Sequence, residues 1–323
     1  MITVLAGGVG AARMLAGIVQ VVRPSEVTAI VNVADDDEMH GLHISPDLDT
    51  VTYTLAGAIN TETGWGLAGE SWQAMETVRR YGGPTWFGLG DRDLGTHLFR
   101  THRLGQGASL TEVTAEIGEG WGLQVRLLPV TEDRLRTKVL ILDDDTPDEG
   151  LEIGFQEYFV QRRHSVPVRG VRFDGADTAS PAPGVIEAII GAEVVVIAPS
   201  NPIVSIGPLF AVSGVMEAVM NRRDHVVAVS PIIAGAALKG PADRLMTELG
   251  HEASVLGVAR MYHKVAGTLV IDEQDEALKP AVEDLGMRCV VTPTIMKDPA
   301  TSSALGRTVI EAGRVGPPPG TVS

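Results

Sequence analysis

The chain has 323 residues, of which 44% are hydrophobic and 21% are charged, and its formal net charge at pH 7 is −15. This composition indicates a globular protein that buries a sizeable core and excludes a disordered chain. The acidic balance argues against nucleic acid or an anionic membrane as partner, so an anionic substrate must be held by glycine amides, a few cations or a metal ion.

The first expected element is a short apolar strand at 2–5, which passes directly into Gly7, Gly8 and Gly10 before a helical pattern begins. Glycines let backbone N–H groups approach a ligand, and a helix N-terminus adds unpaired donors, so a phosphate would sit here. A plain strand-to-helix turn is the alternative. Arg13 stands where a GxGxxG pattern requires its third glycine, which disfavours an ordinary dinucleotide oxidoreductase.

A second strand is expected over 27–33, followed by the acidic run 35–38 as a solvated loop. The next segment, HISPDLDTVTYTLAGAIN, has a helical pattern that Ser45 can cap. Asp47 and Asp49 then fall in the first turn of this helix. Their carboxylates can complement the helix dipole, or they can serve as ligands for a hard cation such as Mg²⁺.

Three further helices are expected in GESWQAMETVRRYG, LGDRDLGTHLFRTHRLGQG and SLTEVTAEIGEGWG. The short run WFGLG would, as a strand, bring Asp91, Arg92 and Asp93 to a strand end, and the alternative is a surface ion-pair cluster. The eight histidines form no metal-ligand pattern. We therefore expect His97 and His102 to be surface or helix-packing residues.

From Leu123 the sequence has strand-like patterns, in LQVRLLPV, TKVLILDD and VPVRGVRF. The segment FQEYFVQRRH is expected to form a short helix between the last two. This predicts an inserted, partly antiparallel region over 123–180. Alternation then resumes with strands expected at 194–198, 226–229, 268–271 and 288–291.

The fold class predicted is therefore α/β, a Rossmann-like and mostly parallel sheet covered by helices. Residues 1–122 and 181–312 would form this core, and the Gly- and Pro-rich stretch 313–323 a flexible tail. The single cysteine, Cys289, lies in the apolar run MRCVVTP and is expected to be a buried structural thiol. Neither a leader pattern nor eighteen uninterrupted apolar residues occur, so we expect a cytoplasmic protein.

In such a fold, ligands collect beyond the carboxyl ends of the strands. The segments expected there are Gly7 to Gly10, Asp47 and Asp49, Gly90 to Asp93, Ser200 and Asn201, and the 235–240 segment with Lys239. Carboxylates, glycines and single cations together suit a phosphorylated ligand with Mg²⁺. An ordinary turn at Ser200 and Asn201 and a solvated Lys239 are the alternatives.

Five long motifs carry a family resemblance: VLAGGVGAARML, NVADDDEMHGLHISPDLDTVTYTLAG, WFGLGDRDLGTHL, VVVIAPSNPIVSIGPL and SPIIAGAALKGPADRLM. Together they closely resemble the 2-phospho-L-lactate transferase family of deazaflavin coenzyme biosynthesis, which includes the actinobacterial phosphoenolpyruvate transferases. The resemblance implies a homodimer that needs Mg²⁺. It also implies transfer of a phosphoenolpyruvyl or 2-phospholactyl group from a GDP-like donor to the deazaflavin alcohol Fo, which releases GMP and gives dehydro-coenzyme F-420-0.

This resemblance suggests roles for individual residues. Asp47 and Asp49 would hold Mg²⁺ against the diphosphate, with Asp49 also close to the Fo hydroxyl. Arg92 would stabilise charge on the transferred group, Asp91 would contact Fo and Gly88 would pass near its ring system. The residues expected to bind the nucleotide are Gly7, Gly8, Val9, Gly10, Ser200, Asn201 and Lys239.

One residue departs from the family pattern, because Ala11 replaces the last glycine of the usual GGVGGA, and its methyl group is expected to narrow the approach of a ligand to the backbone. Proteins of the same wider superfamily share the glycine loop but act as nucleotide-sugar-binding regulators, and these form the alternative class. The WFGLGDRDLGTH stretch favours the transferase. A nicotinamide oxidoreductase, which would bind NAD without a metal, is the third possibility.

Overall fold

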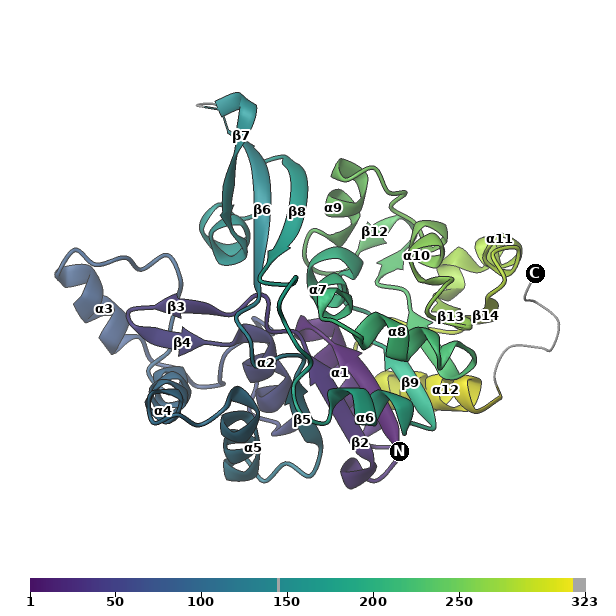
Figure 1. The fold of residues 1–323 in the computed structure, drawn as a ribbon, viewed down its shortest axis with the longest axis horizontal. Helices are drawn as coiled ribbons and strands as arrows, with labels where there is room; N and C mark the ends of the chain where they lie inside the picture. The colour runs from purple at the N-terminus through teal and green to yellow at the C-terminus, as the bar shows by residue number, and fades with distance from the viewer. Residues whose placement is uncertain (144–145, 316–323) are drawn as a thin grey trace.

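A seven-stranded parallel sheet organises the chain, as the alternation of apolar strands and helices predicts (Figure 1). The computed structural model describes residues 1–143 and 146–315. The strands lie in the order β14-β13-β10-β9-β1-β2-β5. Their bounds are β1 (Ile2–Ala6), β2 (Val27–Val31), β5 (Arg126–Pro129), β9 (Val194–Ile197), β10 (Val226–Val229), β13 (Thr268–Ile271) and β14 (Arg288–Val291). All of these pairings are parallel, so the carboxyl ends of the strands meet at one edge.

Helices cover both faces of this sheet. Thr3 in β1 donates its hydroxyl hydrogen to the carbonyl oxygen of Ala188 in α6, which places α6 on one face. Thr3 pairs with Val195 of β9. The preceding residue, Val194, therefore points to the opposite face of the sheet, where it contacts Gly313 of α12. Helix α1 packs against both α2 and α12. The helices are α1 (Gly8–Ile18), α2 (Pro46–Leu55), α3 (Gln73–Arg80), α4 (Asp93–Gly105), α5 (Leu110–Gly120), α6 (Val185–Ile190), α7 (Gly207–Ala211), α8 (Val215–Met220), α9 (Ala242–Glu248), α10 (Val255–Tyr262), α11 (Lys279–Glu283) and α12 (Pro299–Val315).

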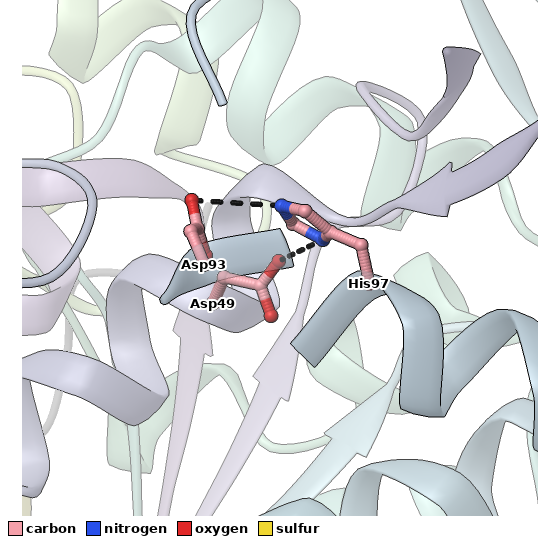
Figure 2. Close-up of side chains that lie close together, drawn as sticks. All are labelled: Asp49, Asp93 and His97. Atoms are coloured by element: carbon pink, nitrogen blue, oxygen red, sulfur yellow. Dashed lines mark ion pairs between the residues drawn. The ribbon is translucent and has the colours of Figure 1, made fainter. Parts of the chain in front are cut away.

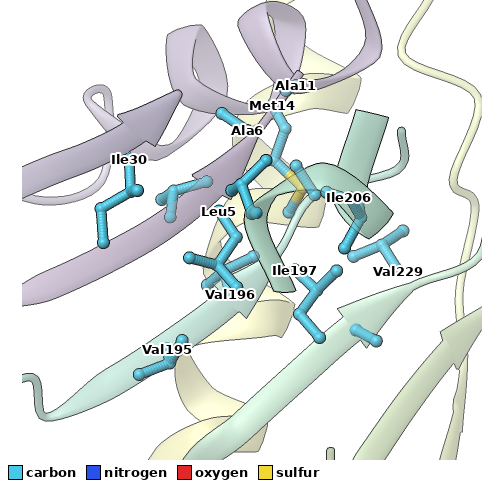
Figure 3. Close-up of a cluster of buried hydrophobic side chains, with 14 of the residues drawn as sticks. Leu5, Ala6, Ala11, Met14, Ile30, Val195, Val196, Ile197, Ile206 and Val229 are labelled. Carbon is cyan, nitrogen blue, oxygen red and sulfur yellow. The ribbon is translucent and has the colours of Figure 1, made fainter. Parts of the chain in front are cut away.

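The main core lies between the central strands and the helices on either side (Figure 3). Leu5, Val196 and Ile197 of the central strands are fully buried, as are Ala11 and Met14 of α1. Burial of such side chains stabilises the fold by roughly 25 cal/mol per Å² of apolar surface removed from water. Cys289 of β14 is buried as predicted, and burial raises the pKa of its thiol to about 12.

A three-stranded antiparallel sheet stands beyond the parallel sheet, at the top of Figure 1. It consists of β6 (Arg136–Asp143), β7 (Thr146–Gly154) and β8 (Val168–Asp174), and the short π-helix η2 (Glu157–Gln161) follows β7. The first strand of the predicted insertion, β5, pairs instead with β2 in the parallel sheet. Two short hairpins complete the set, formed by β3 (Asp37–Met39) with β4 (Leu42–Ile44) and by β11 (Ile232–Ile233) with β12 (Ala236–Ala237).

Three segments differ from what the sequence predicts, and part of one lies outside the residues that the structure describes. The WFGLG run is irregular rather than a strand, because its glycines leave few side chains to pack on a pleated surface. Residues 37 and 38 of the expected acidic loop belong to β3. The first residues of the expected tail, 313–315, end helix α12, and 316–323 lie outside the described residues. No helix in the described part of the chain is long and apolar enough to cross a membrane.

Candidate active site

The carboxyl ends of the central strands open into a cavity of about 570 Å³. All the site residues expected from the sequence line it except Asp91 and Arg92; those that do are Gly7, Gly8, Val9, Gly10, Asp47, Asp49, Gly88, Ser200, Asn201 and Lys239. The loops that the sequence predicted to converge therefore meet at one place.

The glycine turn between β1 and α1 forms the base of the cavity. Gly8 has φ of 72°, a left-handed conformation that favours glycine. A Cβ at Gly10 would overlap the carbonyl oxygen of Pro199, so glycine permits this close approach of two backbones. The hydroxyl of Ser200 donates to the carbonyl oxygen of Gly7 at 2.7 Å, which fixes the loop after β9 against the turn. Ala11 is not among the lining residues, since its methyl group is buried in the core (Figure 3).

Asp47 is a buried carboxylate without a cationic partner among the described residues. Its Oδ2 accepts a hydrogen bond from Asn32 Nδ2 at 3.0 Å, and the backbone N–H of Gly8 also donates to it. The pKa of Asp47 is raised to about 7, chiefly by burial and also by the charge of the nearby Asp36, while the hydrogen bonds from Asn32 and Gly8 offset part of the rise.

Two more buried carboxylates lie beside Asp47. Asp35 also lines the cavity, and burial together with the charges of Asp47 and Asp36 raises its pKa well above the usual range. Asp36 accepts hydrogen bonds from Ser45 Oγ at 2.7 Å and interacts with His43 Nε2 at 3.1 Å. Two expectations are therefore wrong. Asp35 and Asp36 are buried rather than solvated, and the hydroxyl of Ser45 bonds to Asp36 instead of capping α2.

Asp49 is buried on the same helix but is paired. Nη1 of Arg100 lies 3.2 Å from Asp49 Oδ2, and Nη2 of Arg100 contacts the other carboxylate oxygen. Burial raises the pKa of Asp49, and the positive charge of Arg100, the larger of the opposing causes, offsets part of that rise. The Nη1 of Arg100 also lies 3.3 Å from His97 Nδ1. Because a guanidinium can only donate, this contact favours the His97 tautomer with its proton on Nε2.

His97 stands between two carboxylates (Figure 2). Its Nδ1 lies 3.7 Å from Asp49 Oδ2 and its Nε2 lies 3.5 Å from Asp93 Oδ2. Tyr53 donates its hydroxyl hydrogen to Asp93 Oδ1 at 2.6 Å. Burial raises the pKa of Asp93, but His97 and Tyr53 lower it more, so this carboxyl titrates below its usual range.

Within the described ranges, Asp49, Asp93 and His97 are the group of three whose ligand atoms lie close enough together to share a metal ion, within 4.8 Å of one another. The Arg100 guanidinium already faces both oxygens of Asp49, and its positive charge would repel a divalent cation there. The negative charges of Asp35 and Asp47 are less compensated by neighbouring cations than that of Asp49.

Asp91 and Arg92 do not reach the cavity lining. The carboxylate of Asp91 accepts hydrogen bonds from the Ser71 hydroxyl and from the backbone N–H groups of Gln73 and Ala74, so it binds the first turn of α3. The guanidinium of Arg92 donates to the carbonyl oxygen of Ala68 and is exposed.

Several lining residues escaped sequence reasoning. His97 was expected at the surface or in helix packing, yet it is buried and lines the cavity. The spacing of Asp93, His97 and Arg100 at i, i+4 and i+7 on one helix could have indicated a shared face. Asp35 could have been found from its place after β2, at the carboxyl edge of the sheet. Arg13 and Lys297 also line the cavity.

Apolar side chains line the remaining walls. Trp65 and Phe87 come from the segments around α3, and Phe155 and Phe159 come from the segment after β7. The antiparallel sheet therefore contributes to the cavity through the turn that contains η2. A cavity of this size, with apolar walls and charged groups at its base, suits an elongated ligand that has both aromatic and anionic parts.

Comparisons with known proteins show the family of this chain. The sequence model of the family described as "2-phospho-L-lactate transferase CofD" matches residues 2–310. The chain is similar to a phosphoenolpyruvate transferase from Streptomyces griseus, with 44% identity over 96% of this chain and 97% of that protein. A second, from Kitasatospora aureofaciens, is 45% identical over 96% of each chain.

A crystal structure of a UPF0052 family protein from Bacillus halodurans has the same fold. It aligns with a TM-score of 0.60 at 15% identity, over 96% of this chain and 98% of that one. The family model and the close relatives both extend over nearly the whole sequence, and the chain therefore belongs to the 2-phospho-L-lactate transferase CofD family.

Proposed function

We propose that this protein transfers a phosphoenolpyruvyl or 2-phospholactyl group from a GDP-linked donor to the terminal hydroxyl of the deazaflavin alcohol Fo. GMP leaves, and with the enolpyruvyl donor the product is dehydro-coenzyme F-420-0. The observation that carries the proposal is a cavity that collects the glycine turn and buried aspartates of the family motifs at one sheet edge. The named activity of the relatives favours the enolpyruvyl donor.

The reaction is a displacement at phosphorus. A bond forms between the Fo hydroxyl oxygen and the phosphorus that carries the enolpyruvyl group, and the bond from that phosphorus to the bridging oxygen breaks. The electron pair of that bond leaves with GMP. The protein has to align the two reactants and compensate the developing charge.

Asp49 is the residue that we assign to the attacking hydroxyl. It lines the cavity, and Arg100 behind it holds both carboxylate oxygens in a fixed orientation. A carboxylate held in this way can accept the hydrogen of the hydroxyl and direct the oxygen toward phosphorus. The roles of Asp91 at Fo and of Arg92 at the transferred group are further proposals. Each would need its side chain to leave the contacts described above.

Mg²⁺ is part of the proposal, and Asp47 and Asp35 fit such an ion better than Asp49, whose oxygens both face Arg100. Asp47 and Asp35 are buried carboxylates whose charges oppose each other without a cation among the described residues. We propose that Asp47 holds the ion and that Asp49 is the second protein ligand, which requires Asp49 to share its oxygens with Arg100. A bound Mg²⁺ would neutralise charge on the diphosphate oxygens.

The first test is turnover of Asp49→Asn with Fo and the GDP-linked donor at saturating Mg²⁺. Loss of the ionised carboxylate is expected to lower kcat by about a hundredfold or more, within the range of a general base. Full turnover by a normally folded Asp49→Asn protein would refute the assignment. Circular dichroism and thermal unfolding establish the folding of the variant.

A binding measurement separates the transferase from the regulatory alternative. Fo and GDP should each bind the purified protein, and GDP should bind more tightly with Mg²⁺. If neither ligand bound while a UDP-sugar did, the protein would be a nucleotide-sugar-binding regulator instead. Size measurement in solution tests the homodimer, which we also propose together with a cytoplasmic location.

A further inference from the structure

The lining of the cavity carries charges of both signs. Its carboxylates include Asp35, Asp47, Asp49 and Asp93. Its Lys and Arg side chains are Arg13, Lys239 and Lys297. Cations in the lining can compensate negative groups of a ligand that the carboxylates alone would repel.

These cations come from three different parts of the sheet. Arg13 lies on α1, Lys239 lies between β12 and α9, and Lys297 lies between β14 and α12. The loop that carries Lys297 is anchored by Asp272, which accepts hydrogen bonds from the N–H of Thr294 at 2.8 Å and from its hydroxyl at 3.0 Å. Arg13 is partly buried and Lys239 and Lys297 are exposed, and all three side chains line the cavity.

None of the three cations makes an ion pair or side-chain hydrogen bond within the described part of the chain. The chain has 41 acidic residues against 26 basic ones, so carboxylates that could pair with a Lys or Arg side chain are abundant in it. Arg103, Arg172 and Arg314, for example, each pair with a glutamate. Cations that gather unpaired in a cavity of such a protein are available to an anionic ligand.

Charges of both signs lie beside the glycine turn. A Cβ on Gly8 would lie 3.5 Å from Asp47 Oδ1. A Cβ on Gly64 would lie 2.9 Å from Lys239 Nζ and 3.4 Å from Val9 Cγ1, so the ammonium group lies near Val9. This cation is therefore close to the first turn of α1, where a helix N-terminus adds to the attraction for an anion.

We propose that Arg13, Lys239 and Lys297 form one anion subsite that binds the diphosphate and the carboxylate of the donor, and that Arg13 and Lys297 are two further substrate-binding residues. This inference rests on the proposed function for the identity of the donor. A diphosphate diester carries two negative charges and the transferred group carries a carboxylate, so three cations match the ligand in charge. Arg13 stands where the GxGxxG pattern of dinucleotide-binding proteins requires a glycine. Its planar guanidinium can donate two parallel hydrogen bonds to an oxyanion.

The test is calorimetric binding of GDP, inorganic pyrophosphate and guanosine to Arg13→Met and Lys297→Met. Losing one charge-assisted contact is expected to weaken GDP and pyrophosphate binding by about tenfold to a hundredfold and to leave guanosine binding unchanged. The GDP affinity of the variants should also fall less steeply with added salt than that of the wild type.

Arg307→Met and Lys264→Met are matched controls, since both side chains are exposed outside the cavity and each change removes one positive charge. They should bind GDP as the wild type does. Arg13→Lys and Lys297→Arg should recover much of the affinity, which a merely misfolded variant would not do.

Unchanged GDP and pyrophosphate affinity in both Met variants would overturn the subsite, as would failure of the wild type to bind either ligand. Equal weakening by the two control variants would also overturn it, because the effect would then be one of net charge. If GDP bound in this cation-dependent way but no group were transferred to Fo, the subsite would stand and the proposed function would fail.

Discussion

Arg100 and Asp49 form a buried ion pair directly behind the cavity wall, with side chains that are 2% and 7% exposed. Asp49 lines the cavity, whereas Arg100 does not. The arginine therefore compensates the charge of a carboxylate that a ligand can still reach. This pair links the stability of the fold to the residue that we assign to the acceptor hydroxyl.

Removing Arg100 should be costly. Arg100→Met leaves Asp49 buried without its cation, and the expected loss is about 3–5 kcal/mol of unfolding free energy. The double variant Asp49→Asn/Arg100→Met should recover part of this loss, because neither charge is then buried alone. Urea denaturation of both single variants and the double variant measures the coupling, and simple additivity of the two losses would contradict it.

Asp47 should make stability depend on pH. Its carboxyl pKa is raised from 3.8 to about 7 in the folded protein. Between these values the folded state holds a proton that the unfolded state has released, so stability is greatest at the acidic end and falls as pH rises to 7. The change attributable to Asp47 is up to about 4 kcal/mol.

The measurement for Asp47 is thermal or urea unfolding from pH 4.5 to pH 7.5 in the wild type and in Asp47→Asn. The wild type should lose stability relative to Asp47→Asn across this window, because Asn carries no titrating proton. Added Mg²⁺ should stabilise the wild type at pH 7 more than the variant. A constant difference between the two proteins at every pH would show that Asp47 does not titrate there.

Gly10→Ala should disturb the base of the cavity. The added methyl group would overlap the carbonyl oxygen of Pro199, and one backbone segment must move, at an expected cost of about 1–3 kcal/mol. GDP binding should weaken too. Gly95→Ala in α4 is the control, since its methyl group meets nothing within 4 Å, and it should be neutral or stabilising by up to about 1 kcal/mol. Equal effects of the two substitutions on stability would contradict the steric explanation.

Tyr53→Phe removes a buried hydroxyl that bonds to Asp93 and to Thr96 Oγ1, at 2.6 Å and 2.7 Å. The expected loss of stability is about 1–3 kcal/mol, because the carboxylate keeps its burial and loses a donor. Chemical denaturation gives this value. An unchanged midpoint would mean that Asp93 does not depend on Tyr53.

The sequence was most informative where pattern and position agree. The strands at Ile2, Val194 and Val226 are short apolar runs, and all three lie in the parallel sheet as expected. Asp47 and Asp49 could be placed in the first turn of a helix because a proline and a helical apolar pattern surround them. Such local features specify an element before its partners are known.

The remainder of the site depends on contacts between distant segments. Arg100 meets Asp49 across 51 positions of the chain, and spacing within one helix does not indicate such a partner. Asp35 and Asp36 looked like a solvated acidic run, but both are buried, Asp35 against Thr137 of β6 and Asp36 against His43 of β4. Asp91 lies in the WFGLGDRDLGTHL motif, yet its carboxylate accepts hydrogen bonds from the first backbone N–H groups of α3.

The central place of β1 has a consequence for how the protein is made. β1 is synthesised before both of its neighbours in the sheet, β2 and β9, with Ile2 in register with both Val27 and Val194. One side of the strand that leads into the glycine turn therefore has no partner until β9, which begins at Val194, has left the ribosome. The cavity is thus completed late, after a long-range pairing of the kind that slows folding. We expect unfinished chains to expose an apolar strand edge, which makes them dependent on chaperones and prone to aggregate.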